Sequence, residues 1–166
     1  MIHVTYQEQL LSTKSESRCV ALRAELEATR TAFHTLLDSV SITGWRQKGS
    51  SSAWTIGEIF VHLTWALEYL PKEVESARHG HGMFNLPKQL SDALSYWYIR
   101  WIARTATPVS IGRRYDKAMD ATIALLDTIP DDDWKLGADF YGEGFHSVED
   151  LFLAPARHFN EHTSGF

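Results

Sequence analysis

Three histidines have the spacing that suits metal chemistry. His158 and His162 stand four residues apart near the end of the chain, and His62 lies far upstream in a segment of helical periodicity. Residues four apart lie on one face of an α-helix, so both rings can bind one ion while a third ligand comes from another helix. Three neutral imidazoles leave the fourth position of a tetrahedral ion open, which is typical of a catalytic site. The alternative is a core histidine and two unrelated residues at a helix end.

An ion held in this way would supply a nucleophile. A zinc-bound water can have a pKa near about 7, which gives hydroxide for hydrolysis, and a thiolate can displace that water. Glu161, between the two later histidines, and Glu58, one turn before His62, are the candidate catalytic carboxylates. For each of them a surface carboxylate is the alternative, because Glu161 points roughly a quarter turn off the histidine face and Glu58 also has a helix-capping role.

Aromatic residues are a second unusual feature, because six tryptophans occur in a chain of 166 residues. Aromatic side chains at helical spacing usually form a core or a dimer surface, and that is the ordinary interpretation here. The functional interpretation is an apolar wall for a substrate. The candidates for that substrate pocket are Trp65, Tyr69, Trp97 and Trp101.

Helices must position these residues, since no strand pattern of useful length appears. Apolar residues recur at intervals of three and four over 15–40, 56–70, 88–104, 111–129 and 148–162. We therefore predict an all-α fold, a four-helix bundle with an extra helical insert between the second and third bundle helices.

Capping and breaking residues predict where these helices begin and end. Thr55 with Glu58 forms the pattern of a capping box, and Ser110 and Ser147 can cap two later helices. From Pro71 to Pro87 we expect a frayed helix end followed by a loop. The glycine-rich stretch 135–146 predicts an ordered non-helical loop or a short hairpin.

Composition limits the class of protein. A chain of 166 residues with 44% hydrophobic residues indicates one domain over 1–166. A net charge of −5 without a basic cluster argues against a nucleic acid partner. The single Cys19 excludes an intrachain disulfide, and no apolar run is long enough to span a membrane. We expect a soluble cytoplasmic protein.

At this point the sequence resembles the DinB/YfiT-like superfamily of four-helix-bundle metalloenzymes. Residues 54–63, which read Trp-Thr-Ile-Gly-Glu-Ile-Phe-Val-His-Leu, resemble the second-helix signature of that superfamily. Residues 157–162 resemble its C-terminal His-x-x-x-His pattern. The resemblance covers nearly the whole chain in helix order. The segment 85–107 is longer and more aromatic than the usual connection, which predicts a different choice of substrate or partner.

The resemblance implies a divalent ion, nickel or zinc, held by His62, His158 and His162, and it implies a homodimer. Similar proteins include S-transferases and isomerases that use a low-molecular-weight thiol. The expected function is a metal-dependent enzyme that activates water or a small thiol for hydrolysis or group transfer on a small molecule. The alternatives are a non-catalytic metal- or ligand-binding bundle and a degenerate member without metal.

Overall fold

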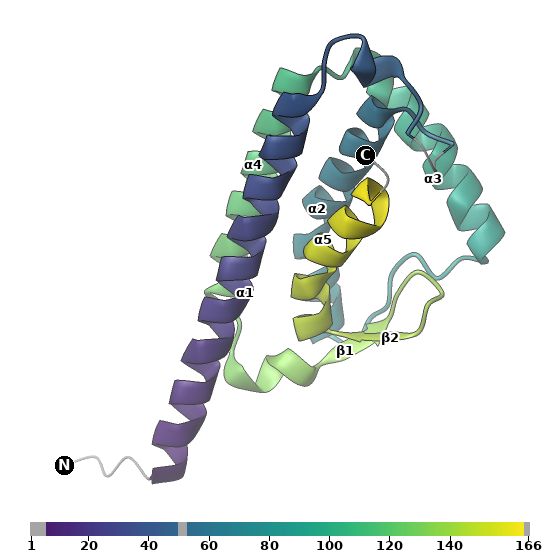
Figure 1. The fold of residues 1–166 in the computed structure, drawn as a ribbon. Coiled ribbons are helices and arrows are strands. Elements are labelled where there is room, and N and C mark those ends of the chain that lie inside the picture. The colour runs from purple at the N-terminus through teal and green to yellow at the C-terminus, as the bar shows by residue number, and fades with distance from the viewer. Residues whose placement is uncertain (1–5, 50–52, 165–166) are drawn as a thin grey trace.

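Helices dominate the computed structural model, which describes residues 6–49 and 53–164 (Figure 1). In chain order the helices and strands of these residues are α1 Tyr6–Ser39, α2 Ile56–Arg78, α3 Lys88–Ile102, α4 Pro108–Leu126, β1 Gly137–Asp139, β2 Phe145–Ser147 and α5 Val148–Thr163. Helix α3 is the predicted insert between the second and third bundle helices. The all-α fold class is confirmed.

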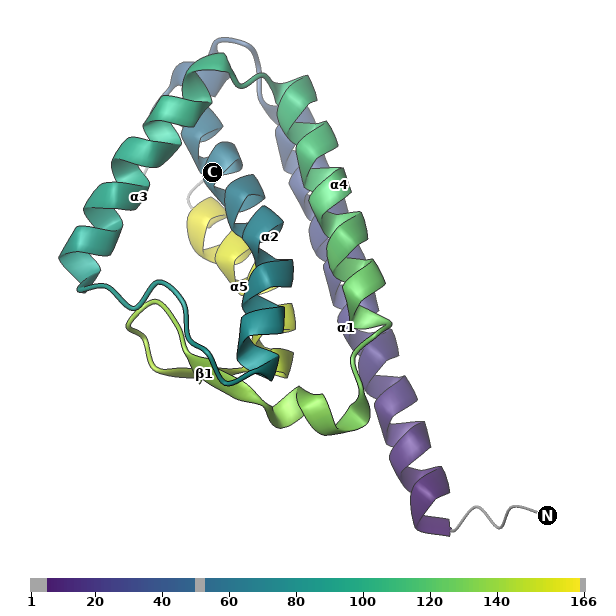
Figure 2. The same ribbon diagram turned by 180° about the vertical axis from the view of Figure 1, so that it is seen from behind.

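Helices α1, α2, α4 and α5 pack together as the bundle, in which the pairs α1–α4 and α2–α5 also contact each other, and α3 stands apart from them. Helix α1 lies alongside α4 and α2 alongside α5, whereas α3 diverges from α2 (Figures 1 and 2). Aromatic side chains join the pairs in the core. Phe33 of α1 stacks on Tyr115 of α4 with 3.6 Å between the ring centroids, and Phe60 of α2 meets the edge of Phe33 at 5.1 Å. Stacked and edge-on pairs of this kind stabilise a core beyond their buried area.

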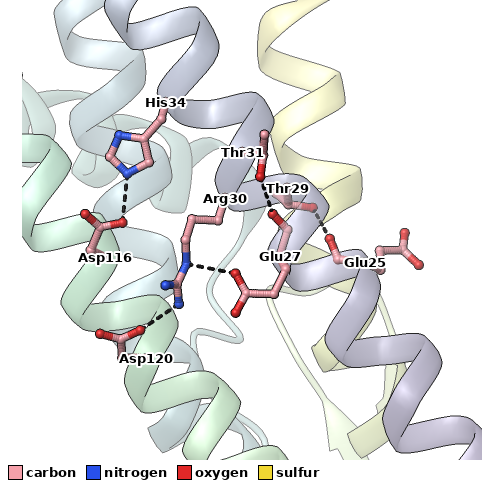
Figure 3. A network of polar contacts seen from close by, with 8 residues as sticks. All are labelled: Glu25, Glu27, Thr29, Arg30, Thr31, His34, Asp116 and Asp120. Carbon is pink, nitrogen blue, oxygen red and sulfur yellow. Dashed lines mark hydrogen bonds and ion pairs between the residues drawn. The ribbon is translucent and has the colours of Figure 1, made fainter.

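Polar side chains close the seam between α1 and α4 at the surface. Arg30 pairs with Asp120 at 2.7 Å and with Glu27 at 3.4 Å, and Nε2 of His34 lies 2.7 Å from the Asp116 carboxylate (Figure 3). Exposed pairs contribute little stability each, about 0–1 kcal/mol. Their main effect is to favour one alignment of the two helices.

Helix α2 differs from the prediction because it continues through Pro71 and ends at Arg78. Proline has no N–H to donate to the preceding turn, which normally weakens a helix at that point. The residues beyond it compensate, because Val74 and Ala77 are completely buried and extend the apolar face begun by Leu70. Helix α1 likewise begins at Tyr6, before the predicted residue 15, where the ribbon extends past the rest of the bundle (Figure 1).

Capping boxes start three helices. Thr55 caps α2 and Ser147 caps α5, as predicted. Ser110 is not the cap of α4, however, because Thr107 caps that helix and Ser110, its third residue, is the partner of Thr107 in the capping box. Pro108 is the first residue of α4, where its missing N–H has no helical partner in any case.

A short antiparallel hairpin precedes α5, with Gly137 paired to Ser147. It confirms that the glycine-rich stretch is ordered and non-helical. A Cβ atom on Gly137 would lie 2.2 Å from the carbonyl oxygen of His146, so glycine allows the strands to approach. None of the described helices has the length and apolar character needed to cross a membrane.

Candidate metal centre

The antiparallel pair of α2 and α5 brings the three predicted histidines together. His62 comes from α2, and His158 and His162 come from successive turns of α5. The ring centroid of His62 lies 4.6 Å from that of His158 and 4.8 Å from that of His162. The centroids of His158 and His162 are 4.7 Å apart. One potential ligand atom from each ring falls within 4.8 Å of the others. The three imidazoles therefore surround one point.

One nitrogen of each ring lies near those of the other two rings. Nε2 of His62 lies 2.8 Å from Nε2 of His158, close enough for a hydrogen bond in which one ring donates and the other accepts. Nitrogen atoms from three converging imidazoles form a donor set that suits zinc and nickel.

Burial keeps the histidines neutral. It lowers the pKa of His62 to about 2, and positive charge on His158 or His162 would lower it further. Burial also lowers the pKa of His158 to about 4, followed by the effect of His162. Burial also lowers the pKa of His162, although the nearby carboxylate of Glu161 raises it in part. Neutral imidazoles have the lone pairs that metal binding requires.

The outer nitrogen of His62 lacks the support that metal-binding histidines usually have. Nδ1 of His62 is buried, and no described residue makes a hydrogen bond to it. A ligating imidazole commonly donates its other N–H to a carboxylate or a carbonyl oxygen. Here the indole of Trp54 packs against the ring instead. Its ring centroid lies 4.5 Å from that of His62 and 5.9 Å from that of His162. With its proton on Nδ1, His62 presents the lone pair of Nε2 toward His158, and an ion could take the place of the hydrogen bond between the two rings, so the donor set fits a metal.

Local sequence fixes both helices at their first turns. The Thr55 hydroxyl accepts from the Glu58 N–H at 3.2 Å, and the Glu58 carboxylate accepts from the Thr55 N–H at 2.7 Å. Ser147 and Asp150 form the same pair of bonds at 3.1 and 3.0 Å. Phe159, between the two histidines of α5, is buried in the core. These contacts hold the backbone from which the imidazoles project.

The two candidate carboxylates lie at different places. Glu58 is half-buried, and its second oxygen lies 3.7 Å from Nε of Arg100. Glu161 is exposed. Its negative charge acts on the site by raising the pKa of His162, against the larger effect of burial. Neither carboxylate has a hydrogen bond to the three histidines within the described part of the chain.

The four candidate pocket aromatics divide into two groups. Trp65 packs against Tyr69, with ring centroids 4.9 Å apart, and both rings contact Phe84. Trp97 and Trp101 line a cavity beside Glu58 at the end of α3, and its described lining does not include Trp65 or Tyr69. Tyr98 of α3 lies between the two groups, with its ring centroid 5.6 Å from that of Trp65 and 6.3 Å from that of Trp101, so the four residues are linked through Tyr98 rather than in direct contact.

Trp54 is the residue at this site that was not among the predicted site residues. Its ring contacts both helices of the cluster, through His62 and His162. The sequence does contain a signal for it. Trp54 immediately precedes the N-cap Thr55, a position from which a large apolar side chain can turn back onto the first turns of a helix.

Comparison with known proteins identifies the family. The sequence model of the DinB superfamily matches residues 25–164, and the chain belongs to that superfamily. Neither the curated proteins nor the solved structures compared with the chain include a match. Superfamily membership and the three-histidine cluster together fit a metal-binding protein.

Proposed function

We propose that this protein is a metal-dependent enzyme in which His62, His158 and His162 hold one divalent ion, nickel or zinc. The observation that carries the proposal is the convergence of three neutral imidazoles from two helices, with all three candidate ligand atoms within 4.8 Å of one another. When bound, such an ion lowers the pKa of a water or thiol and so supplies a nucleophile for hydrolysis or group transfer on a small molecule.

The residues around the cluster support this role in two ways. Burial disfavours protonation of His62 and His158, so competition from protons at neutral pH is weak. Trp54 covers His62 and His162 with an apolar surface, which limits the access of water.

For proton transfer we propose Glu161 and Glu58. Glu161 adjoins His162 in sequence and influences its pKa, and Glu58 lies one turn before His62 on α2. E161Q and E58Q should each retain the ion. If one of the two carboxylates accepts the proton, the variant that replaces it should lose turnover. Retention of full turnover in both variants would remove these two residues from the proposal.

The ligand assignment is tested by metal content. Protein purified without an affinity tag should bind close to one nickel or zinc ion per chain after reconstitution and desalting. H158A should bind much less while keeping a helical circular dichroism spectrum. H79A is the matched control, because His79 is an exposed histidine at the end of α2. Full metal retention in folded H158A would contradict the assignment.

Enzymatic activity is tested separately. Small electrophiles are screened with several cellular thiols and with water, using metal-loaded and chelator-treated protein. We expect turnover that depends on the ion. An occupied site without turnover in this screen would favour the non-catalytic binding protein instead.

From the resemblance alone we further propose a homodimer in the cytoplasm that uses a low-molecular-weight thiol. Analytical ultracentrifugation of the purified protein tests the oligomeric state, with a mass of twice 18.9 kDa expected.

A further inference from the structure

An open cavity of about 600 Å³ lies where the end of α3 meets the beginning of α2. Its wall also includes the short 3-10 segments Gly44–Arg46 and Ala103–Thr105, and the elements meet at one end of the molecule (Figures 1 and 2). This volume is in the range of small-molecule sites, about 300–1,000 Å³. The described residues that line it do not include the three histidines, so it lies outside the histidine cluster, although the candidate carboxylate Glu58 belongs to its wall.

The charge of this cavity is opposite to that of the protein. Arg46, Arg100 and Arg104 line it, and among the described lining residues Glu58 is the one carboxylate. Two positive charges are therefore left in excess, whereas the chain as a whole carries −5. A hollow of one sign concentrates ligands of the opposite sign.

The three guanidinium groups differ in how they are engaged. Arg100 lies 3.7 Å from the Glu58 carboxylate, donates to the Tyr96 hydroxyl at 2.6 Å and lies over the Tyr96 ring. Arg46 and Arg104 have neither an ion pair nor a hydrogen bond with any described residue. Their planar groups of donors match the two oxygens of a carboxylate or phosphate.

Flat apolar surface lies next to these charges. Trp97 and Trp101, one turn apart on α3, are 69% and 63% exposed although they line the cavity. Trp45 is held in place behind them, stacked on Phe60 and seated on Gly57, where a Cβ atom would come within 2.5 Å of the indole. Exposed indoles beside free guanidinium groups indicate a ligand that has both a ring and an anionic group.

We propose that this cavity binds a small organic anion, a carboxylate or phosphate on a flat apolar body, with Arg46 and Arg104 on the anionic group and Trp97 and Trp101 against the ring. The site does not depend on an ion at the histidines.

Calorimetric titration of the full chain in EDTA tests this proposal without the proposed ion. The probes are 2-naphthoate, 2-naphthyl phosphate and the neutral 2-naphthalenemethanol. We expect at least one anion to bind and to bind more tightly than the alcohol, and the better of the two anions identifies the group that the cavity prefers. Equal affinity for all three probes, or no binding of either anion at millimolar concentration, would overturn the proposal.

Variants locate the binding. The double variant R46Q/R104Q should bind the preferred anion about tenfold or more weakly, because it loses charge-assisted hydrogen bonds. W97L should weaken both the anion and the alcohol. R113Q is the matched control, since Arg113 is an exposed arginine of α4 outside the cavity. Unchanged affinity in a folded R46Q/R104Q protein would contradict the proposed site.

Discussion

Glu73 is a buried carboxylate on α2 that the proposed chemistry does not use. It is 4% exposed, and the hydroxyl of Tyr141, from the turn of the hairpin, donates a hydrogen bond to it. Burial raises the pKa of Glu73 to about 7, although the bond from Tyr141 acts in the opposite direction. Below pH 7 the folded protein thus favours the neutral carboxylic acid. The hydrogen bond between Tyr141 and Glu73 ties the hairpin to the bundle.

This pKa makes stability depend on pH in a defined direction. Since the folded pKa of about 7 exceeds the ordinary value of 4.5, the contribution of Glu73 is complete below pH 4.5 and is lost as pH rises through 7. The shift corresponds to about 3 kcal/mol. Wild-type protein should therefore lose stability relative to E73Q between pH 5 and pH 8, measured by urea unfolding. E25Q, at an exposed carboxylate of α1, should show no such trend. A pH-independent difference between wild type and E73Q would contradict this.

The sequence predicted the histidines of the site but not the arrangement of the aromatic residues around them. Spacing placed His158 and His162 on one helix face, helical periodicity offered His62 as the third ligand, and the resemblance assigned one ion to all three, so the cluster was predicted residue by residue. The split between Trp65 and Trp97 was not predictable, because it depends on the angle at which α3 leaves the bundle. The unpartnered Nδ1 of His62 was equally hidden, since it reflects which side chains fail to reach the ring.

The capped first turns of α2 and α5 fix the two helices that carry the histidines. Removing the N-cap hydroxyl in T55A or S147A should lower the free energy of unfolding by about 1 kcal/mol, because the first turn loses a hydrogen bond. It should also weaken metal binding, since those caps begin the two helices that hold the cluster.

The matched control is T107A, at the capping box of α4, which contributes no histidine to the cluster. We expect a similar loss of stability with unchanged metal affinity, measured by urea unfolding and by competition with a chelator. Equal metal affinities in T55A, S147A and T107A would show that the caps do not position the site.

Elements were predicted where local chemistry decides them. The Thr55 and Ser147 caps and the non-helical hairpin follow from short-range hydrogen bonding and glycine content, and the structure confirms them. The errors arose where packing decides. Proline at 71 was read as the start of fraying, yet burial of the following apolar residues maintains α2 to Arg78. The cap of α4 is Thr107 rather than the predicted Ser110.

Across the whole molecule, a shared ion would join segments that are far apart in sequence. His62 and His158 are separated by 96 positions, and they belong to helices packed in one core. An ion that binds the folded state alone stabilises it by about 2.7 kcal/mol at a hundredfold excess over its dissociation constant. We expect nickel or zinc to raise the melting temperature of wild type and to leave that of H158A unchanged.

The control for this effect is H79A, which should respond to the ion as wild type does. An equal rise in melting temperature for H158A and wild type would mean that the metal acts elsewhere on the protein.

The central claim is that three imidazoles share one ion, and X-ray absorption spectroscopy of the zinc-loaded protein tests it most directly. We predict three histidine nitrogens at about 2.0–2.1 Å from the metal, with one further light atom completing the shell. In H158A or H162A the histidine signal should decrease. A first shell made of oxygen atoms, with no imidazole scattering, would contradict the account.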